Sequence, residues 1–231
     1  MAAGDYAGLQ VQAWGPEGPL ECLAPWGGST FSPAARLQVG ELLRVPRQQA
    51  ELAGSLVPAR VAAEDWQTIS MGVELPRWGV RGRYLIFCRG AAERTSGLFP
   101  EIDFRPAKGE ILRLENPALQ ETRTLRRGLW IAPQPGGDFL AGRTSGWNQL
   151  DDEPTAAARG IILRGLSEWL PGPWRVVDQR AGIRPSVAQT QPVVQLPQGE
   201  RRIGALNGLG ARGSLWAPLT ALELVNGLRV G

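Results

Sequence analysis

The sequence predicts an α+β fold with a mixed, mostly antiparallel sheet. Three observations lead to this class. Short apolar runs separated by turn residues occupy the middle of the chain, and the stretch around residue 160 has the apolar period of a helix. The 30 glycines and 19 prolines are spread between the apolar segments of the 231-residue chain, which indicates many turns and no long disordered linker.

Strands are expected wherever a short apolar run is bounded by turn residues. The run Tyr84–Cys88 is apolar throughout, which is typical of a strand that is buried on both faces and has a neighbour on each side. Three later runs follow closely on one another and are expected side by side as a meander. These three are residues 108–115, 128–134 and 138–144, and the other expected strands are 9–14, 19–25, 174–185 and 201–207.

Three helices are expected. The first begins at residue 33 and runs at least to Leu43, because Ser32 is a suitable N-cap and a proline follows it at the first helical position. The last covers residues 218–228, with Leu222 and Val225 facing inward. The clearest helix begins at the acidic and proline residues 152–154 and ends before the Pro-Gly pair 171–172. Its apolar face consists of Ile162, Leu166, Trp169 and Leu170.

Composition excludes several kinds of chemistry. The two cysteines, Cys22 and Cys88, are far apart and form no CxxC pair, so neither a disulfide framework nor a thiolate zinc site is expected. The chain contains no histidine, which removes Ser-His-Asp and Cys-His nucleophilic systems and histidine-ligated metals. No metal site is therefore expected.

Charge and hydropathy narrow the possible partners. The net charge is +3, but the arginines are scattered and form none of the basic runs of a nucleic-acid-binding protein. No apolar run approaches the roughly 20 residues that cross a bilayer, and the first ten residues lack the pattern of a signal peptide. We expect a cytoplasmic protein with no nucleic-acid or membrane partner.

The segment Gly208–Gly213 reads GxGxxG and lies between an expected strand and an expected helix. In a complete dinucleotide-binding unit an acidic residue follows about 20 positions later, but only 18 residues follow Gly213, so a complete unit is not expected here. Closely spaced glycines before a helix N-terminus still present backbone N–H groups to an anionic or electron-rich group. The alternative is a glycine turn that serves only tight strand–helix packing.

Five segments in order carry a resemblance to a known family. They are LIFCRG, PAKGEILRL, LWIAPQPGGDFLAGRT, GIRPS and NGLGARGSLWAPLTALEL. Together they resemble the C-terminal part of FAD-dependent oxidoreductases of the D-amino-acid oxidase and glycine oxidase family, from roughly residue 19 to the end. The resemblance implies a substrate-type domain plus an incomplete FAD-binding, Rossmann-like part, without the early strand, glycine loop and helix that bind the pyrophosphate.

The resemblance also implies how the chain is divided. Residues 1–80 would be a partial substrate domain, and residues 81–100 a strand and turn of the FAD-binding part. Residues 101–180 would supply the sheet and helix of the substrate domain, and residues 181–231 the C-terminal strand, turn and helix that contact FAD.

The same resemblance implies roles for individual residues. Arg184 in GIRP matches the arginine that pairs with the substrate carboxylate, for which a planar guanidinium is suited. Trp130 falls where the family carries an aromatic residue at the substrate cavity. The residues expected near the cofactor are Gly90, Ala91, Gly208, Leu209, Gly210, Ala211, Arg212, Gly213 and Ser214.

Four of these residues also have an ordinary structural explanation. Arg184 would otherwise be a surface arginine after a turn, and Trp130 a packing residue. Gly90 would otherwise be a strand-ending turn, and Arg212 a partner in a salt bridge. Lys108 lies in a strong family pattern but has no expected role beyond that of a strand-edge lysine.

The resemblance implies FAD-dependent oxidation of a small amine or amino acid, in which a hydride passes from the α carbon to the flavin. The absence of histidine is compatible with this, because the flavin itself accepts the hydride. The chain is expected to be a truncated or incomplete form, with an upstream segment or a second polypeptide completing the FAD site. The alternative is a non-catalytic binding module or fragment that has lost the cofactor.

Overall fold

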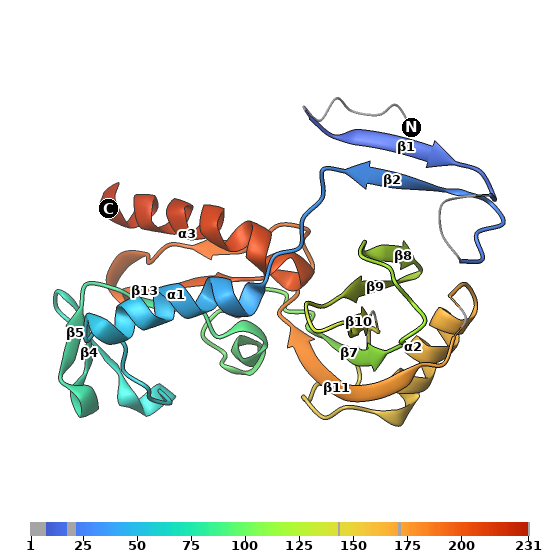
Figure 1. The fold of residues 1–231 in the computed structure, drawn as a ribbon. Helices are drawn as coiled ribbons and strands as arrows, with labels where there is room; N and C mark the ends of the chain where they lie inside the picture. Colours follow the sequence, from blue (N-terminus) through green and yellow to red (C-terminus); the bar gives the residue numbers. More distant parts are fainter. Residues whose placement is uncertain (1–7, 18–21, 143, 171, 231) are drawn as a thin grey trace. The chain divides into compact units, whose positions relative to one another are not determined.

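The structure is a computed structural model that describes residues 8–17, 22–142, 144–170 and 172–230 (Figure 1). The chain divides into two compact units, each assembled from three segments. Unit 1 comprises Met1–Pro46, Glu110–Thr144 and Glu153–Ala181, and unit 2 comprises Arg47–Gly109, Ser145–Asp152 and Gly182–Gly231. The mixed α+β class with antiparallel sheets is confirmed, whereas the expected domain boundaries stay a prediction.

A five-stranded sheet forms the centre of unit 1. Its strand order is β11-β7-β10-β9-β8, so β10 lies between β7 and β9 and the meander does not follow chain order. Strand β8 pairs with the other side of β9, so only β10 is left to pair with β7. The β9–β10 hairpin is tight, and its Gln134 N–H donates to the Asp138 carbonyl at 2.7 Å. The strands are β7 (Ala107–Glu115), β8 (Leu125–Arg127), β9 (Leu129–Pro133), β10 (Phe139–Gly142) and β11 (Arg175–Arg184).

Helix α2 (Ala156–Ser167) packs on one face of this sheet, as Figure 1 shows. Its N-cap is Thr155, whose hydroxyl accepts a hydrogen bond from the Ala158 N–H at 3.1 Å, so the helix begins just after the expected acidic start. The expected apolar face is buried, including Trp169 and Leu170 beyond the helix end. The core consists of Leu112, Leu114, Leu125, Leu129, Ile131, Phe139, Ala141, Ile162, Leu166, Trp169 and Leu170.

The N-terminal part of unit 1 differs from expectation. Strand β1 (Gln10–Trp14) pairs with β2 (Gly28–Ser32), which places Ser32 opposite Gln10. Because Ser32 ends a strand, it is not an N-cap, and helix α1 begins only at Val39 and runs to Leu52. Of the expected strand 19–25, residues 19–21 lie outside the described residues and 22–25 form no strand.

Unit 2 contains two three-stranded sheets. In the first, β13 (Ile203–Asn207) lies between β12 (Val193–Gln195), which is antiparallel to it, and β6 (Leu85–Phe87), which is parallel. Within the described residues β6 has this one strand neighbour, and only Phe87 of β6 is buried, so the expectation of a strand buried on both faces was wrong. The second sheet consists of β3 (Gln67–Ile69), β4 (Gly72–Leu75) and β5 (Val80–Gly82).

Helix α3 (Gly213–Val230) contacts β12 and β13 within unit 2. Thr220 and Leu224 are buried, whereas Leu222 is 57% exposed and Val225 is 43% exposed, so the expected inward face was wrong. Thr220 and Leu224 are four residues apart and share one side of the helix, and Leu222 lies between them on the opposite side. No helix among the described residues is long and apolar enough to cross a membrane.

Short 3-10 helices complete the described secondary structure. They are η1 (Ala63–Asp65), η2 (Pro76–Trp78), η3 (Gly90–Thr95), η4 (Gly199–Arg201) and η5 (Gly210–Arg212). The helices η3 and η5 follow the parallel strands β6 and β13.

Candidate cofactor and substrate site

Two glycine turns of unit 2 leave the same end of a sheet. Strand β6 leads into Gly90 and η3, and strand β13 leads into Gly208 and η5. Because β6 and β13 run parallel, their carboxyl ends lie at one sheet edge. This is the edge at which open α/β sheets bind ligands.

Asn207 joins the two turns. Its side chain is buried, and its Nδ2 donates to the Gly90 carbonyl at 3.0 Å while its Oδ1 accepts from the Gly208 N–H at 2.8 Å. From the sequence, Asn207 was expected as the last residue of a strand and the first of the segment NGLGARGSLWAPLTALEL, with no role of its own. The available signal was a polar side chain at the end of the otherwise apolar run IGAL.

The expected glycine turn after β13 is present. Gly208 has a φ of +74°, and a Cβ there would lie 2.8 Å from the Val187 side chain, so both conformation and space favour glycine. The turn passes through η5 directly into α3, and the N-terminus of a helix carries a partial positive charge. Gly208 therefore serves tight packing, and this does not prevent the turn from also presenting its backbone to a ligand.

The turn after β6 is held by a buried carboxylate. Glu93 in η3 accepts from Arg89 Nε and Nη2, both at 2.9 Å, and from the Ser96 hydroxyl. Burial opposes ionisation of Glu93, but the hydrogen bonds from Arg89 and Ser96 outweigh burial and lower the pKa of its carboxyl. Gly90 and Ala91, both half-buried, begin this anchored turn.

Pro185, the neighbour of Arg184, connects the GIRPS segment to both turns. Its carbonyl accepts a hydrogen bond from the Gly210 N–H at 3.2 Å. A Cβ at Gly90 would lie 3.7 Å from the Pro185 side chain. Unit 2 thus brings together three of the segments that the sequence assigned to the cofactor and substrate.

Arg184 is half-buried, and its guanidinium lies over the backbone of Gly109. Nη1 donates to the Ser145 hydroxyl at 3.4 Å. These contacts do not decide between a substrate-binding arginine and an ordinary structural one. Its role toward a substrate stays a prediction.

Lys108, next to Gly109, is buried and forms an ion pair with Asp151. Its backbone exchanges two hydrogen bonds with Gly146, at 2.8 and 2.9 Å. It is thus more than a strand-edge lysine, because it holds the segment that carries Ser145 against β7. Sequence spacing gave no signal for this pair, since its members are 43 positions apart.

Trp130 belongs to unit 1. On β9 it alternates with the buried Ile131, so its indole lies on the sheet face away from the core. It pairs with Gly142, where a Cβ would lie 3.1 Å from the indole. The structure describes Trp130 within unit 1 and Arg184 within unit 2.

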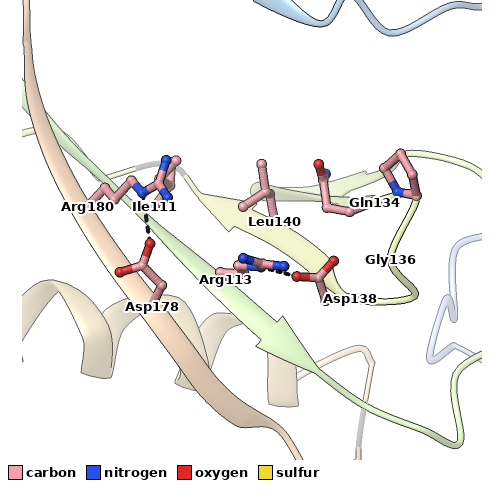
Figure 2. A pocket seen from close by; sticks show the side chains of 9 residues that line it. Ile111, Arg113, Gln134, Gly136, Asp138, Leu140, Asp178 and Arg180 are labelled. Carbon is pink, nitrogen blue, oxygen red and sulfur yellow. Dashed lines mark hydrogen bonds and ion pairs between the residues drawn. The ribbon is translucent and has the colours of Figure 1, made fainter. Parts of the chain in front are cut away.

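The face of the unit 1 sheet away from the core also carries a cavity of about 260 Å³ (Figure 2). Arg113 points toward Asp138, and Arg180 donates to Asp178 at 2.8 Å, so two ion pairs line this cavity. The hydrogen bond from Arg180 lowers the pKa of the Asp178 carboxyl. Neither Trp130 nor Arg184 lines it.

A model of the family described as DAO, FAD dependent oxidoreductase, matches residues 3–226. The chain belongs to this family. FAD is the cofactor of the family, and the glycine turns of unit 2 fit such a group, because Gly208–Ser214 combine a left-handed glycine with the N-terminus of an 18-residue helix. Among the described residues no group of three or more His, Cys, Asp or Glu side chains is arranged to hold a metal ion.

Two relatives are glycine oxidases. The glycine oxidase of Bacillus licheniformis is 30% identical over 134 residues, which cover 54% of this chain and 36% of that protein. The crystal structure of glycine oxidase from Geobacillus kaustophilus superposes with a TM-score of 0.78 at 23% identity, covering 94% of this chain and 62% of that one. The chain therefore spans less than two thirds of these relatives.

A second solved structure contains the cofactor. It is L-alpha-glycerophosphate oxidase from Mycoplasma pneumoniae with FAD bound, with a TM-score of 0.54 and 18% identity. The similarity covers 63% of this chain and 42% of that one. At these identities the two solved structures show the shared fold.

Proposed function

We propose that this chain forms the substrate side of an FAD-dependent oxidoreductase that oxidises a small amine or amino acid. The main support is the position of Pro185, which follows Arg184 and contacts both the Gly90 turn and the Gly208–Gly213 turn. On this proposal, the arginine that would bind the substrate carboxylate and the turns that would hold the cofactor belong to segments that meet within unit 2. Family membership and the glycine oxidase relatives support this proposal.

Each group has a stated task in the proposal. Residues 208–214 and Gly90-Ala91 would hold the cofactor, with the N–H groups at the start of α3 stabilising negative charge. The guanidinium of Arg184 binds the substrate carboxylate and fixes the direction of the α C–H bond. When bound, FAD supplies the hydride acceptor, which no side chain of the chain provides.

We further propose that an upstream segment or a second polypeptide supplies the pyrophosphate-binding part of the site. The support is that the chain spans 36% of the glycine oxidase of B. licheniformis and 62% of the solved one. On this proposal the chain is a truncated form that contains only part of the FAD-binding site. A cytoplasmic location also stays a prediction.

The test is flavin reduction under anaerobic conditions. The chain is mixed with FAD, either alone or with the polypeptide encoded directly upstream, and glycine, larger amino acids and simple amines are added while flavin absorbance is followed. Bleaching by an amine or amino acid in the completed mixture supports the proposal. Stable flavin binding without bleaching by any of these compounds would favour the second candidate, a binding module without redox activity.

A further inference from the structure

The guanidinium of Arg184 occupies the space that a side chain at position 109 would need. A Cβ built on Gly109 would lie 1.9 Å from Nη2, 2.4 Å from Cζ and 2.8 Å from Nη1 of Arg184. Atoms of this kind pack at roughly 3.5–4 Å, so no side chain fits at position 109 while the guanidinium stays where it is.

The requirement at Gly109 is for space and not for backbone conformation. Gly109 lies in strand β7 and is absent from the described glycines with positive φ, so its backbone suits any residue. The three atoms nearest to a Cβ at position 109 all belong to the flexible end of the Arg184 side chain. Replacing Gly109 by alanine should therefore leave the strand intact and displace the guanidinium.

We infer that Gly109 is a positioning residue that fixes the Arg184 guanidinium for two-point binding of a carboxylate. Gly109 lies beneath the guanidinium, and the Ser145 hydroxyl accepts from its Nη1. Two-point binding depends on the plane of the guanidinium as well as on its charge. The inference rests on the proposed role of Arg184 in binding the substrate carboxylate.

The displacement is large enough to matter for binding. A Cβ at position 109 forces Nη2 outward by on the order of 2 Å to restore ordinary packing contact. A misplacement of about 1 Å is sufficient to cost roughly a hundred-fold in an oriented reaction. A guanidinium displaced by this much should therefore hold a carboxylate less well.

The chain offers a matched control at Gly146. A Cβ there meets no atom within 4 Å, and Gly146 also lacks a positive φ. Gly146 is bonded through its backbone to Lys108, the neighbour of Gly109. Gly146→Ala therefore adds one methyl group in the same region without touching Arg184.

The test uses the chain labelled with ¹⁵N-arginine, and the Arg184 Nε–H signal is identified by its loss in Arg184→Lys. Acetate is titrated into the wild type, Gly109→Ala and Gly146→Ala, with methylammonium as a probe that lacks a carboxylate. We expect acetate to shift the Arg184 signal in the wild type and in Gly146→Ala. In Gly109→Ala we expect the Arg184 Nε–H chemical shift to differ from that of the wild type before acetate is added. We also expect the affinity for acetate to be at least ten-fold weaker than in the wild type.

The outcomes distinguish the positioning role of Gly109 from the proposed carboxylate-binding role of Arg184. An unchanged Arg184 signal and equal acetate affinity in Gly109→Ala would overturn the positioning role of Gly109 alone. A wild-type signal that ignores acetate would overturn the carboxylate role of Arg184, and the inference with it. If Gly109→Ala lowers the melting temperature, that loss must disappear in an Arg184→Ala background, because the clash has then been removed.

Discussion

The side-chain amide of Asn207 donates to the carbonyl oxygen of Gly90 at 3.0 Å, across a sequence separation of 117 residues. The same side chain accepts from the Gly208 N–H, so one buried residue fixes both glycine turns. Asn207→Leu preserves the volume but removes both bonds and leaves the half-buried Gly90 carbonyl without this donor, which should cost about 1–3 kcal/mol of unfolding free energy. FAD affinity of the completed protein should fall as well, as measured by flavin fluorescence quenching.

Thr220 provides the control for this variant. It is equally buried in unit 2, and its hydroxyl donates only to carbonyls of its own helix, Trp216 and Ala217. Thr220→Val should lower the melting temperature without a separate effect on FAD affinity. Equal FAD affinities in Asn207→Leu and the wild type would show that the link between the turns has no part in cofactor binding.

Arg184→Lys should reduce turnover of amino acids far more than it reduces stability. Lysine keeps the positive charge but loses the planar two-point grip. The loss of one charge-assisted hydrogen bond corresponds to about 1.5–3 kcal/mol, or roughly ten- to a hundred-fold in kcat/KM. Stopped-flow flavin reduction in the completed enzyme, alongside thermal melts, measures both effects, and equal reduction rates would remove Arg184 from the site.

The ion pair of Glu93 with Arg89 should make stability depend on pH. The folded-state pKa of Glu93 is lowered, so its contribution is present above the ordinary glutamate value of about 4.3 and is lost as pH falls through the lower folded value. We expect Glu93→Gln to be less stable than the wild type at pH 7, with the difference shrinking below about pH 4. Urea unfolding at pH 3 to 7 checks this, and a gap that stays constant over this range would contradict it.

Trp130 and Ile131 allow a comparison of the two faces of β9. Ile131 is buried in the core, so Ile131→Ala should cost about 2–5 kcal/mol in unfolding free energy. Trp130→Ala should cost less, because the indole is only half-buried on the other face. If Trp130 contacts the substrate, its replacement should change the KM of the completed enzyme while the thermal melt moves little. A melt shift as large as that of Ile131→Ala would make Trp130 a packing residue.

Helix α3 exposes an apolar stripe that should limit solubility. Its members recur at helical spacing and are all exposed. The double variant Leu219→Glu/Leu222→Lys should reduce aggregation, as measured by light scattering, and should change the melting temperature little. The control Leu224→Ala, on the buried side of α3, should lower the melting temperature. Unchanged scattering in the double variant would show that this stripe does not drive aggregation. The stripe consists of Leu215, Leu219, Leu222 and Val225.

Local patterns predicted the elements whose burial is regular. The two-residue alternation of β7 and the 3.6-residue spacing of Ile162 and Leu166 each have one buried face, which the sequence displays directly. The resemblance added Arg184 and the Gly208–Gly213 turn, which unit 2 brings together through Pro185. Their chemistry follows from residue type once the motif is recognised.

The failures have a common physical cause, because each depends on a partner distant in the sequence. Ser32 is a good N-cap by type, but pairing with Gln10 keeps it in a strand. Leu222 has the spacing of an inward residue, yet β12 and β13 contact the opposite side of α3. Asn207 gains its importance from Gly90, which no local pattern reveals.

Each compact unit is a mosaic of three stretches of sequence, because the chain passes between units after Pro46, Gly109, Thr144, Asp152 and Ala181. No single contiguous gene segment therefore encodes either unit, and recombination that exchanges one uninterrupted stretch of the chain would divide at least one of them. Synthesis on the ribosome is constrained in the same way. Unit 1 lacks its last segment until residue 181 has left the exit tunnel, and unit 2 lacks α3 until the end of the chain has been made. Neither unit can therefore complete its folding early in synthesis.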